Sequence, residues 1–459
     1  MTSPTARSNP ASDTSETTTT TTTNGDREPS YHSFIPVPSQ WASPITIGNS
    51  FDNSLTPNGT TISRHHCLSS IEKEGGRILS IGLVYLEMTG EEVVYAGTDS
   101  RSVRIWKLPC FTEFGKLKSG SKSVDSMVVS SQHGLVFTAH SDRKIRVWTS
   151  SPANSRRGTL PSLKDSFMES LVNQSAKISI LRSIKTGTLP QSPSSPTMPS
   201  VYRDDIKKSR HSGFITSMAY DPMNNLLYSG SKDHTIKVWN IGGMKIVKTI
   251  QAHSAGVNSV VVGPDGLVCS GSDDRTIKIW QMNNLTEGGS NTTHSVMFFS
   301  LKEHRSTPKS LVVGGEGRAE EYILYAGCSD GYLHFWKLGL RHLMEYMGFV
   351  RAHNDPILCL AAVGKLVVTG SVDGGVRVWC RTRDGHRCIA ILEGHVGPVK
   401  AVAVRLDRDS DGCMVYSGGC DGFLKQWWVS TGLSASGAGG NRSDAVSGNG
   451  AGCWHRYRD

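Results

Sequence analysis

Apolar residues alternate with small or polar ones along LLYSGSKDHTIKVWN, which runs from Leu226 to Asn240. A period of two residues is typical of half-buried β-strands. The central residues SGSKDHT interrupt the alternation, and Gly and Asp are favoured in tight turns. The stretch therefore predicts two strands joined by a turn. Its acidic residue Asp233 lies beside His234, a pairing that fits either a catalytic dyad or a repeated structural part.

The same pattern occurs seven times, each time with a Trp near the end of the second strand. The copies begin at Val94, Val136, Leu226, Val268, Leu324, Val367 and Val415, and their tryptophans are Trp106, Trp148, Trp239, Trp280, Trp336, Trp379 and Trp427. Most spacings between these tryptophans lie in the forties, near the ~40–45-residue period of repeats that fold as four-stranded blades. Two longer gaps, after Trp148 and after Trp280, indicate insertions.

Each copy is flanked by further strand-like segments, such as ITSMAYD after Phe214 and MKIVKTI from Met244. Four strands per copy and seven copies predict an all-β fold, a seven-bladed β-propeller whose radial closure covers most strand edges. The seventh copy has no strand-like segment after it, whereas residues 64–72 resemble the outer strands of other copies. We therefore expect residues 64–72 to complete blade seven beside the strand at residues 422–429.

Polar residues recur at fixed places in these copies. A His precedes the first strand, a Ser or Thr lies on the second, an Asp lies in the turn, and the Trp lies on the third. This pattern resembles the WD40-repeat family over about residues 60–430, and the resemblance implies one buried hydrogen-bond network per blade. It assigns four complete sets: His211, Ser229, Asp233 and Trp239; His253, Ser270, Asp274 and Trp280; His353, Thr369, Asp373 and Trp379; His395, Ser417, Asp421 and Trp427.

Three blades depart from this pattern. Blade five has His304, but Ala326 replaces the hydroxyl residue. Blade two has no His near Gly120. Blade one is the least regular, because Ala96 and Ser100 stand where the hydroxyl and the acid belong. We expect its network to be missing.

The repetition favours a structural role for Asp233, bonded to His211, over a catalytic pair with His234. The acid recurs in six of seven copies, whereas an active site is a single constellation of residues. The sequence has no Cys-x-x-Cys or His-x₃-His spacing for a metal, and the Gly-rich run at Gly314 lacks the Gly-Lys-Ser/Thr of a phosphate loop. We expect no enzyme, and no catalytic, metal or cofactor site.

The composition predicts two tails and a basic insertion. Residues 1–59 are Ser/Thr-rich and residues 433–459 are Gly/Ser-rich, so we expect both to be disordered tails around a propeller at residues 60–432. An insertion at about residues 151–200 follows blade two, and its LKDSFMESLV has a helix-like apolar spacing. The ten Lys/Arg and four Asp/Glu of residues 151–212 give +6 of the net +9. This stretch suits either acidic partners or a solvated loop.

The ten cysteines, several of them inside predicted strands, indicate reduced, buried side chains rather than disulfides. The chain has no apolar signal segment and no apolar run of ~18 residues. We expect an intracellular, monomeric propeller without membrane contact.

The segment GTLPSLKD just after the second blade's Trp, together with the chain length, resembles the plant JINGUBANG-like WD40 proteins. That resemblance implies a non-enzymatic regulator that binds other proteins in the cytoplasm, the nucleus or both. It names no partner.

Three functions remain open, and the first is an interaction scaffold, because loops on a rigid frame carry binding. The second, a substrate receptor of a cullin-type ubiquitin ligase, usually has Arg three places after the blade Trp. None of the seven copies has a basic residue there. The third, nucleic-acid binding through the insertion, is poorly provided with stacking residues, since only Phe167 and Tyr202 lie among its charges.

For the scaffold, we expect partners at the face that carries the turn before each network Asp and the connection into each first strand. The positions predicted there are Arg77, Leu79, Asp99, Phe214, Thr216, Lys232, Asn258, Asp273, Lys309, Leu358, Val372 and Lys400. Apolar anchors within a charged rim are typical of protein-binding patches. The alternative is that Leu79, Phe214, Leu358 and Val372 are half-buried against neighbouring blades.

Overall fold

Twenty-eight short strands in seven antiparallel four-stranded sheets make up the part of the chain that the structure, a computed structural model, describes. That part comprises residues 65–72, 76–86, 90–100, 102–118, 120, 123–150, 155–162, 209–282, 295–301, 306–315, 322–339, 344–383, 385–407 and 410–431. The predicted tails, His304, most of the insertion and its helix-like segment lie outside these residues.

The strands follow one another in order within each blade. Blade one has β2 (Ile78–Leu86), β3 (Glu91–Thr98), β4 (Ser102–Leu108) and β5 (Thr112–Lys118). Blade two has β6 (Val124–Ser130), β7 (Leu135–His140), β8 (Ile145–Thr149) and β9 (Arg156–Leu160). Blade three has β10 (Ile215–Asp221), β11 (Leu226–Ser231), β12 (Thr235–Asn240) and β13 (Lys245–Gln251). Blade four has β14 (Val257–Val262), β15 (Leu267–Ser272), β16 (Ile277–Met282) and β17 (Ser295–Leu301).

The remaining three blades repeat this arrangement. Blade five has β18 (Pro308–Gly314), β19 (Ile323–Cys328), β20 (Tyr332–Leu338) and β21 (Met344–Arg351). Blade six has β22 (Ile357–Val363), β23 (Leu366–Ser371), β24 (Val376–Thr382) and β25 (Gly385–Leu392). Blade seven has β26 (Val399–Leu406), β27 (Gly412–Gly419), β28 (Phe423–Ser430) and, from the other end of the chain, β1 (His65–Glu72).

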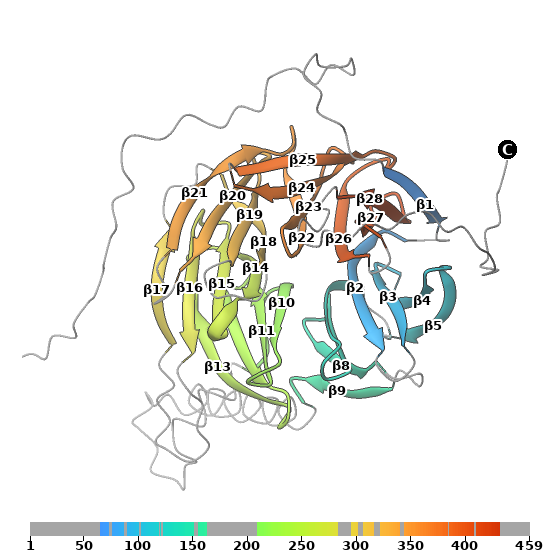
Figure 1. Cartoon of the computed structure of the whole chain (residues 1–459). Coiled ribbons are helices and arrows are strands. Elements are labelled where there is room, and N and C mark those ends of the chain that lie inside the picture. The colour runs from blue at the N-terminus through green and yellow to red at the C-terminus, as the bar shows by residue number, and fades with distance from the viewer. Residues whose placement is uncertain are drawn as a thin grey trace, which may run out of the picture. The chain divides into compact units, whose positions relative to one another are not determined.

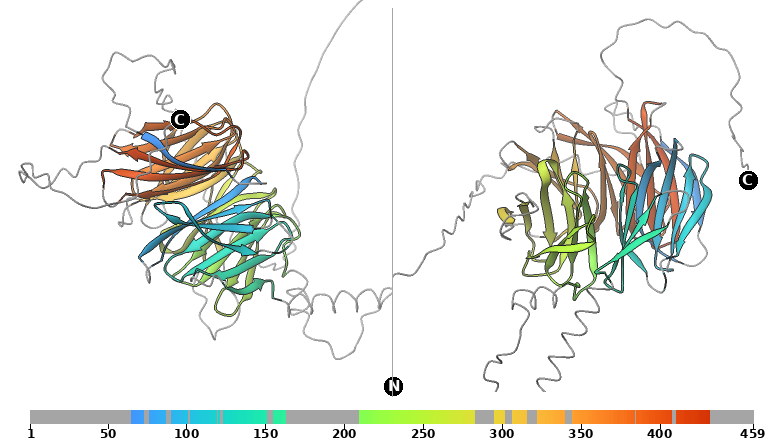
Figure 2. Two further views of the ribbon diagram at one scale, coloured as in Figure 1. Left: turned by 90° about the vertical axis from the view of Figure 1, so that its right-hand side faces the viewer. Right: turned by 90° about the horizontal axis from the view of Figure 1, so that it is seen from below.

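The blades stand in a closed ring with the first strand of each nearest the centre (Figure 1). Each first strand contacts the first strands of both neighbouring blades, and β26 of blade seven contacts β2 of blade one. The side views show the blade strands running through the thickness of the ring (Figure 2). The expected seven-bladed β-propeller is therefore confirmed.

Blade seven is completed by both ends of the described chain. Strand β1 pairs with β28 in antiparallel register from His65 opposite Val429 to Glu72 opposite Phe423, which confirms the expectation for residues 64–72. Between blades seven and one, the Arg405 Nε lies 2.8 Å from the Glu92 Oε2. The ring thus closes through a strand ladder and an ion pair across the seam.

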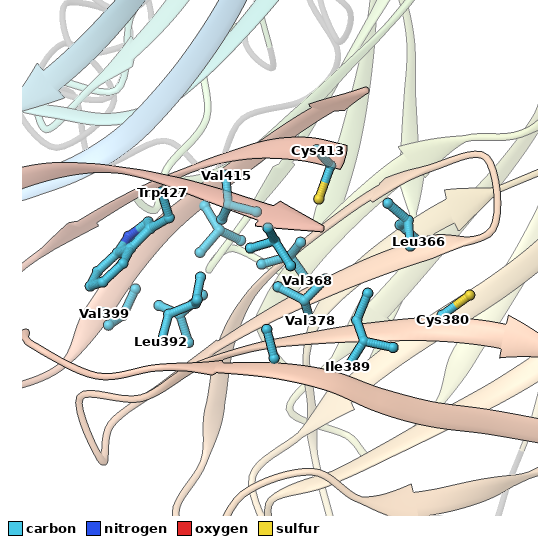
Figure 3. Packing of buried hydrophobic residues seen from close by; sticks show 14 of the residues in the cluster. Leu366, Val368, Val378, Cys380, Ile389, Leu392, Val399, Cys413, Val415 and Trp427 are labelled. Atoms are coloured by element: carbon cyan, nitrogen blue, oxygen red, sulfur yellow. The ribbon is translucent and has the colours of Figure 1, made fainter. Parts of the chain in front are cut away.

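The hydrophobic core is a set of seven similar clusters between neighbouring blades. In the cluster between blades six and seven, Trp427 packs with Leu392 and Val378 of blade six (Figure 3). Each of the other network tryptophans likewise packs with the blade before its own, and Trp106 of blade one packs with Tyr416 of blade seven. The repeated Trp is therefore the main apolar contact from one blade to the next.

A hydrogen-bond network crosses each regular blade. In blade three the Trp239 indole N–H donates to the Ser229 Oγ at 2.9 Å. The same Oγ lies 2.9 Å from the His211 Nε2, and the His211 Nδ1 lies 2.9 Å from the Asp233 Oδ2. One neutral tautomer satisfies all groups: the Ser hydroxyl donates to Nε2, and the Nδ1–H donates to the carboxylate.

The other three complete sets have the same geometry. The His-to-Asp distances are 2.9, 2.9 and 2.8 Å for His253–Asp274, His353–Asp373 and His395–Asp421. The His-to-hydroxyl distances are 2.8, 2.7 and 2.8 Å to Ser270, Thr369 and Ser417. Trp280, Trp379 and Trp427 donate to these hydroxyls at 2.9, 3.2 and 2.8 Å.

Blade two uses a different histidine, which the sequence interpretation missed. Trp148 donates to the Thr138 Oγ1 at 2.9 Å, and the His140 Nε2 lies 2.8 Å from the same oxygen. His140 comes from the second strand itself, two residues after the hydroxyl. Asp142 instead forms an ion pair with Arg146 at 2.8 Å. The sequence did contain a signal for this role, because His140 stands where blades three and four have Ser231 and Ser272.

Burial lowers the pKa of the imidazole in each complete set, and in blades three, four and six the pKa of the network acid is lowered as well. Burial lowers the pKa of His211; the bond to Asp233 opposes this, and the positive charge of Lys237 adds to the lowering. Burial alone would raise the pKa of Asp233, but hydrogen bonds from His211, Thr235 and the Ser212 N–H hold it well below its usual range. The neutral imidazole and charged acid match the tautomer above.

A basic residue two places before each Trp was also missed. The seven are Arg104, Arg146, Lys237, Lys278, His334, Arg377 and Lys425. Lys278, Arg377 and Lys425 lower the pKa of the network histidine of their own blade, as Lys237 does. Several also bond toward the outer strand, for example Lys237 to Thr249 at 3.0 Å.

Deleting residues 60–72 should abolish cooperative folding or lower the melting temperature severely, because it removes β1 and leaves β28 as an open edge. Deleting residues 1–55 should leave the melting temperature unchanged. Circular dichroism melts of the two truncated proteins check this, and equal tolerance of both deletions would contradict closure by β1.

The neighbouring acids Asp273 and Asp274 give a matched test of the network. Asp274→Ala removes the carboxylate that accepts from His253, from the Ser254 N–H and from Thr276, and it should reduce the free energy of unfolding by about 1–3 kcal/mol. Asp273→Ala removes partly exposed ion pairs with Lys232 and Lys309 and a hydrogen bond from Asn258, and it should cost about 0–1 kcal/mol. Urea titrations of both variants provide the measurement. A larger loss for Asp273→Ala would refute the structural assignment.

Mild acid should destabilise the propeller through its buried histidines. The unfolded chain takes up protons on histidine below about pH 6.5, whereas the folded imidazoles, with lowered pKa values, do not. Each buried histidine then removes up to about 1.4 kcal/mol per pH unit from the free energy of unfolding. The contribution of the neutral buried histidines to the free energy of unfolding is therefore complete above about pH 6.5 and declines below it. Urea titrations between pH 7.5 and 5.5 test this, and His211→Gln should show a shallower decline.

Candidate functional site

The strands of each blade alternate in direction, so the turn between the second and third strands lies at the same end as the connection into the first strand. In blade three these are residues 231–235 and 209–214. We call the face formed by these ends in all blades the upper face, and the opposite one the lower face. The predicted binding positions belong to the upper face.

Four predicted residues from three neighbouring blades form one polar group, the rim cluster: Lys232, Asn258, Asp273 and Lys309. The Lys232 Nζ donates to the Asp273 Oδ2 at 2.7 Å and to the Asn258 Oδ1 at 2.6 Å. The Asn258 Nδ2 and the Lys309 Nζ both donate to the Asp273 Oδ1, each at 2.8 Å. Asn258 also donates to the Pro308 carbonyl at 3.0 Å. The cluster thus links blades three, four and five.

Asp273 is the centre of the rim cluster. Burial tends to raise the pKa of its carboxyl, but Lys232, Lys309 and Asn258 together hold that pKa well below its usual range. The carboxylate is therefore charged and offsets one of the two ammonium groups. The cluster presents a net single positive charge in a fixed arrangement, rather than the two independent cations that the sequence suggested.

Phe214 is the exposed apolar residue beside this cluster, with 60% of its surface accessible. Its carbonyl accepts the Lys232 N–H at 2.9 Å, which fixes the loop against the rim cluster. Gly213 makes the close approach possible, since a Cβ there would lie 2.6 Å from the Asp233 nitrogen. The Ser212 N–H donates to the network carboxylate at 2.8 Å. The network of blade three therefore determines where Phe214 is presented.

The other apolar positions expected on this face are not exposed. Leu79, Leu358 and Val372 are each half-buried, so the alternative interpretation holds for these three. Thr216 is also half-buried, and its hydroxyl lies 2.6 Å from the Val257 carbonyl of blade four. The position of these side chains in the repeat is like that of Phe214 and so did not predict the difference, because residues from other parts of the ring bury them.

The charged positions outside the rim cluster fall into two cases. Arg77 and Asp99 of blade one form an exposed ion pair at 3.0 Å, so Asp99 pairs with an arginine rather than with a network histidine. Lys400 of blade seven is exposed. The structure therefore joins four of the predicted residues in one group and two in a second; the other six lie on blades one, three, six and seven.

Val396 was not among the predicted positions, yet 86% of its surface is exposed on the upper face. It follows the network residue His395, where three other blades have Ser212, Ser254 and Asn354. The sequence could have indicated this exposed position, because it has an apolar residue where the other blades have polar ones. Its N–H donates to the Asp421 carboxylate at 3.0 Å, so its loop is held like that of Phe214.

Within the described ranges, His, Cys, Asp and Glu side chains form no group of three or more that could hold a metal ion. The helices found in that part of the chain include none with the length and apolar character needed to span a membrane.

Comparison with known proteins identifies the repeats. The family model "WD domain, G-beta repeat" matches residues 112–149, 206–240, 244–281, 344–380 and 386–427. The match at residues 112–149 starts at the outer strand of blade one and ends on the third strand of blade two, so a repeat is offset from a blade by one strand. The matched segments leave out the second and third strands of blades one and five, where Ala96 and Ala326 stand at the hydroxyl position of the second strand.

The chain is similar to several proteins with known names. It is 29% identical over 197 residues to the guanine nucleotide-binding protein subunit beta of Oryza sativa subsp. japonica, covering 39% of this chain and 47% of that protein. It is 25% identical over 299 residues to the ribosome biogenesis protein ytm1 of Neurospora crassa, covering 62% and 55%. The chain thus spans about half the length of these curated relatives. Matched repeats, networks and ring together show that the chain carries WD40 repeats folded as a seven-bladed β-propeller.

Proposed function

We propose that the protein is a non-enzymatic interaction scaffold that binds partner proteins on the upper face of the propeller. The observation that carries the proposal is the exposed side chain of Phe214, whose backbone carbonyl accepts the N–H of Lys232, a member of the rim cluster. An apolar anchor in a rigid polar surround is the usual anatomy of a protein-binding hot spot. The rim cluster supplies that surround, because its ion pairs are already formed before a partner arrives.

The proposal includes a closer relationship to the plant JINGUBANG-like WD40 proteins, with action in the cytoplasm, the nucleus or both. The GTLPSLKD segment supports it. Its residues Gly158 to Leu160 lie at the end of β9, the outer strand of blade two, so the segment is part of the blade as well as of the insertion. The proposal treats the propeller as a monomer that acts without a cofactor.

Phe214→Ala and Lys400→Glu, singly and combined, should weaken partner capture, and the double variant should abolish it. Both side chains are exposed, so the melting temperature should change little, since surface substitutions usually stay within about 0.5 kcal/mol. Affinity purification of the full chain with quantitative mass spectrometry, beside a thermal melt of each variant, provides the measurement.

Leu406→Ala is the matched control, because Leu406 is an exposed apolar residue (46%) at the lower end of β26. It should leave capture unchanged. Capture that survives the double variant but is lost in Leu406→Ala would reject the upper face. Loss of capture together with a lowered melting temperature in Phe214→Ala would assign that residue to the fold instead.

A further inference from the structure

A small cleft lies on the lower face between blades two and three. It has a volume of about 200 Å³ and is lined by His133, Leu135, Arg157, Asn225, Ile241 and Gly242. These residues come from the turn before β7, the start of β9, the turn before β11 and the turn after β12. Such turns lie at the end of the blades opposite to the network Asp, so this cleft is separate from the upper face.

A chain of hydrogen bonds orients the polar wall of the cleft. The Tyr220 hydroxyl donates its single proton to the Asn225 Oδ1 at 2.7 Å. The Tyr220 oxygen, 2.7 Å from the His133 Nδ1, must therefore accept from that nitrogen. Because the Oδ1 of Asn225 faces Tyr220, its Nδ2 is the other end of the amide. That nitrogen lies 3.3 Å from where a Cβ of Gly242 would stand, which places it at the cleft wall.

Arg157 adds a positive charge to this wall. Burial and Asp221 raise the pKa of Tyr220, and the charge of Arg157 acts in the opposite direction. Arg157 lines the same cleft as Asn225, although it is itself exposed. The amide Nδ2 of Asn225 and the guanidinium are both hydrogen-bond donors. A ligand that matches them must bring acceptors and negative charge.

The floor of the cleft is apolar. Leu135 and Ile241 are 3% and 1% exposed and belong to the core cluster between blades two and three. On the same turn as Asn225, two residues before it, Met223 has 84% of its surface exposed. A flexible, exposed Met is suited to contact apolar groups of varied shape. The site therefore combines donors, a small apolar floor and an adjacent apolar surface.

We propose that this cleft binds an acidic side chain, Asp or Glu, of a partner peptide, whose apolar neighbour in sequence lies on Met223. The volume admits one side chain. One guanidinium and one amide match a carboxylate with one charge, and Arg–carboxylate bonds are strong because they are charge-assisted. The site is independent of the proposed function, because it lies on the other face and uses none of the same residues.

The chain offers a matched pair of variants at adjacent positions of β9. Successive strand residues point to opposite sides, so Arg157 lines the cleft and Arg156 does not. Arg157→Glu and Arg156→Glu make the same change in net charge. Both residues are exposed, so both variants should fold with the melting temperature of the unmodified protein, and a thermal melt confirms this before binding is measured.

The probe is a display library of random heptapeptides selected on the full chain carrying Phe214→Ala, which removes the upper-face anchor. Peptides recovered on this protein should carry Asp or Glu next to an apolar residue. Their affinity should fall about tenfold with Arg157→Glu, the loss expected from one charged hydrogen bond, and stay unchanged with Arg156→Glu. Replacing the peptide's acid by its amide should cause a similar loss.

Four outcomes would overturn the proposal. The first is a set of selected peptides that is not enriched in acids. The second is an equal loss of binding with Arg156→Glu and Arg157→Glu, which would indicate general charge attraction. The third is complete displacement of the peptide by millimolar inorganic phosphate, which would indicate a phosphate site. The fourth is peptide binding that appears only after deletion of residues 163–208, which would identify the chain's own insertion as the occupant. None of these outcomes bears on Phe214 and partner capture by the upper face.

Discussion

The architecture of this propeller depends on a buried neutral imidazole between a hydroxyl and a carboxylate. In each complete blade, protons are donated in one direction, from Trp to Ser or Thr, then to His, then to Asp. Reversing one bond would leave a buried donor facing a donor, which is costly in a dry interior. The network therefore ties the third strand to the connection before the first strand. It also fixes the loop that presents Phe214, because the same carboxylate accepts the neighbouring backbone N–H.

Electrostatics and packing reinforce each other around this imidazole. Burial lowers the pKa of the network histidine, and in the complete sets the basic residue two places before the Trp, such as Lys237, adds to this lowering. The Lys237 side chain also donates to Thr249 of the outer strand. The Trp of the strand that carries Lys237 packs with the blade before its own. One strand thus contributes to the network, to the interface between blades and to the protonation state. Blade two reaches a comparable result with His140, which shows that the hydroxyl needs an imidazole more than it needs one particular loop.

The sequence predicted the ring, its closure and the members of four networks, because each rests on a repeated local pattern. The alternation of apolar and polar residues predicts the strands, and the regular spacing of the Trp residues predicts the blades. Because no strand-like segment follows the seventh copy, residues 64–72 were predicted to supply its outer strand. The sequence did not predict which upper-face positions are exposed. Leu79, Leu358 and Val372 occupy places like that of Phe214 along the repeat, yet they are half-buried. The pairing of Lys232 and Lys309 with Asp273 also joins three blades, and no pattern within one copy records a contact between copies.

The register of blade seven also has a mechanical consequence. His65 lies opposite Val429, and β28 ends one residue later at Ser430, so the two ends of the described chain leave the ring at one end of one antiparallel ladder. Tension applied at these two points would load the hydrogen bonds one after another, as in opening a zipper, and not all together in shear. Under a pulling force applied at these two points, the β1–β28 ladder should therefore be the first part of the ring to open.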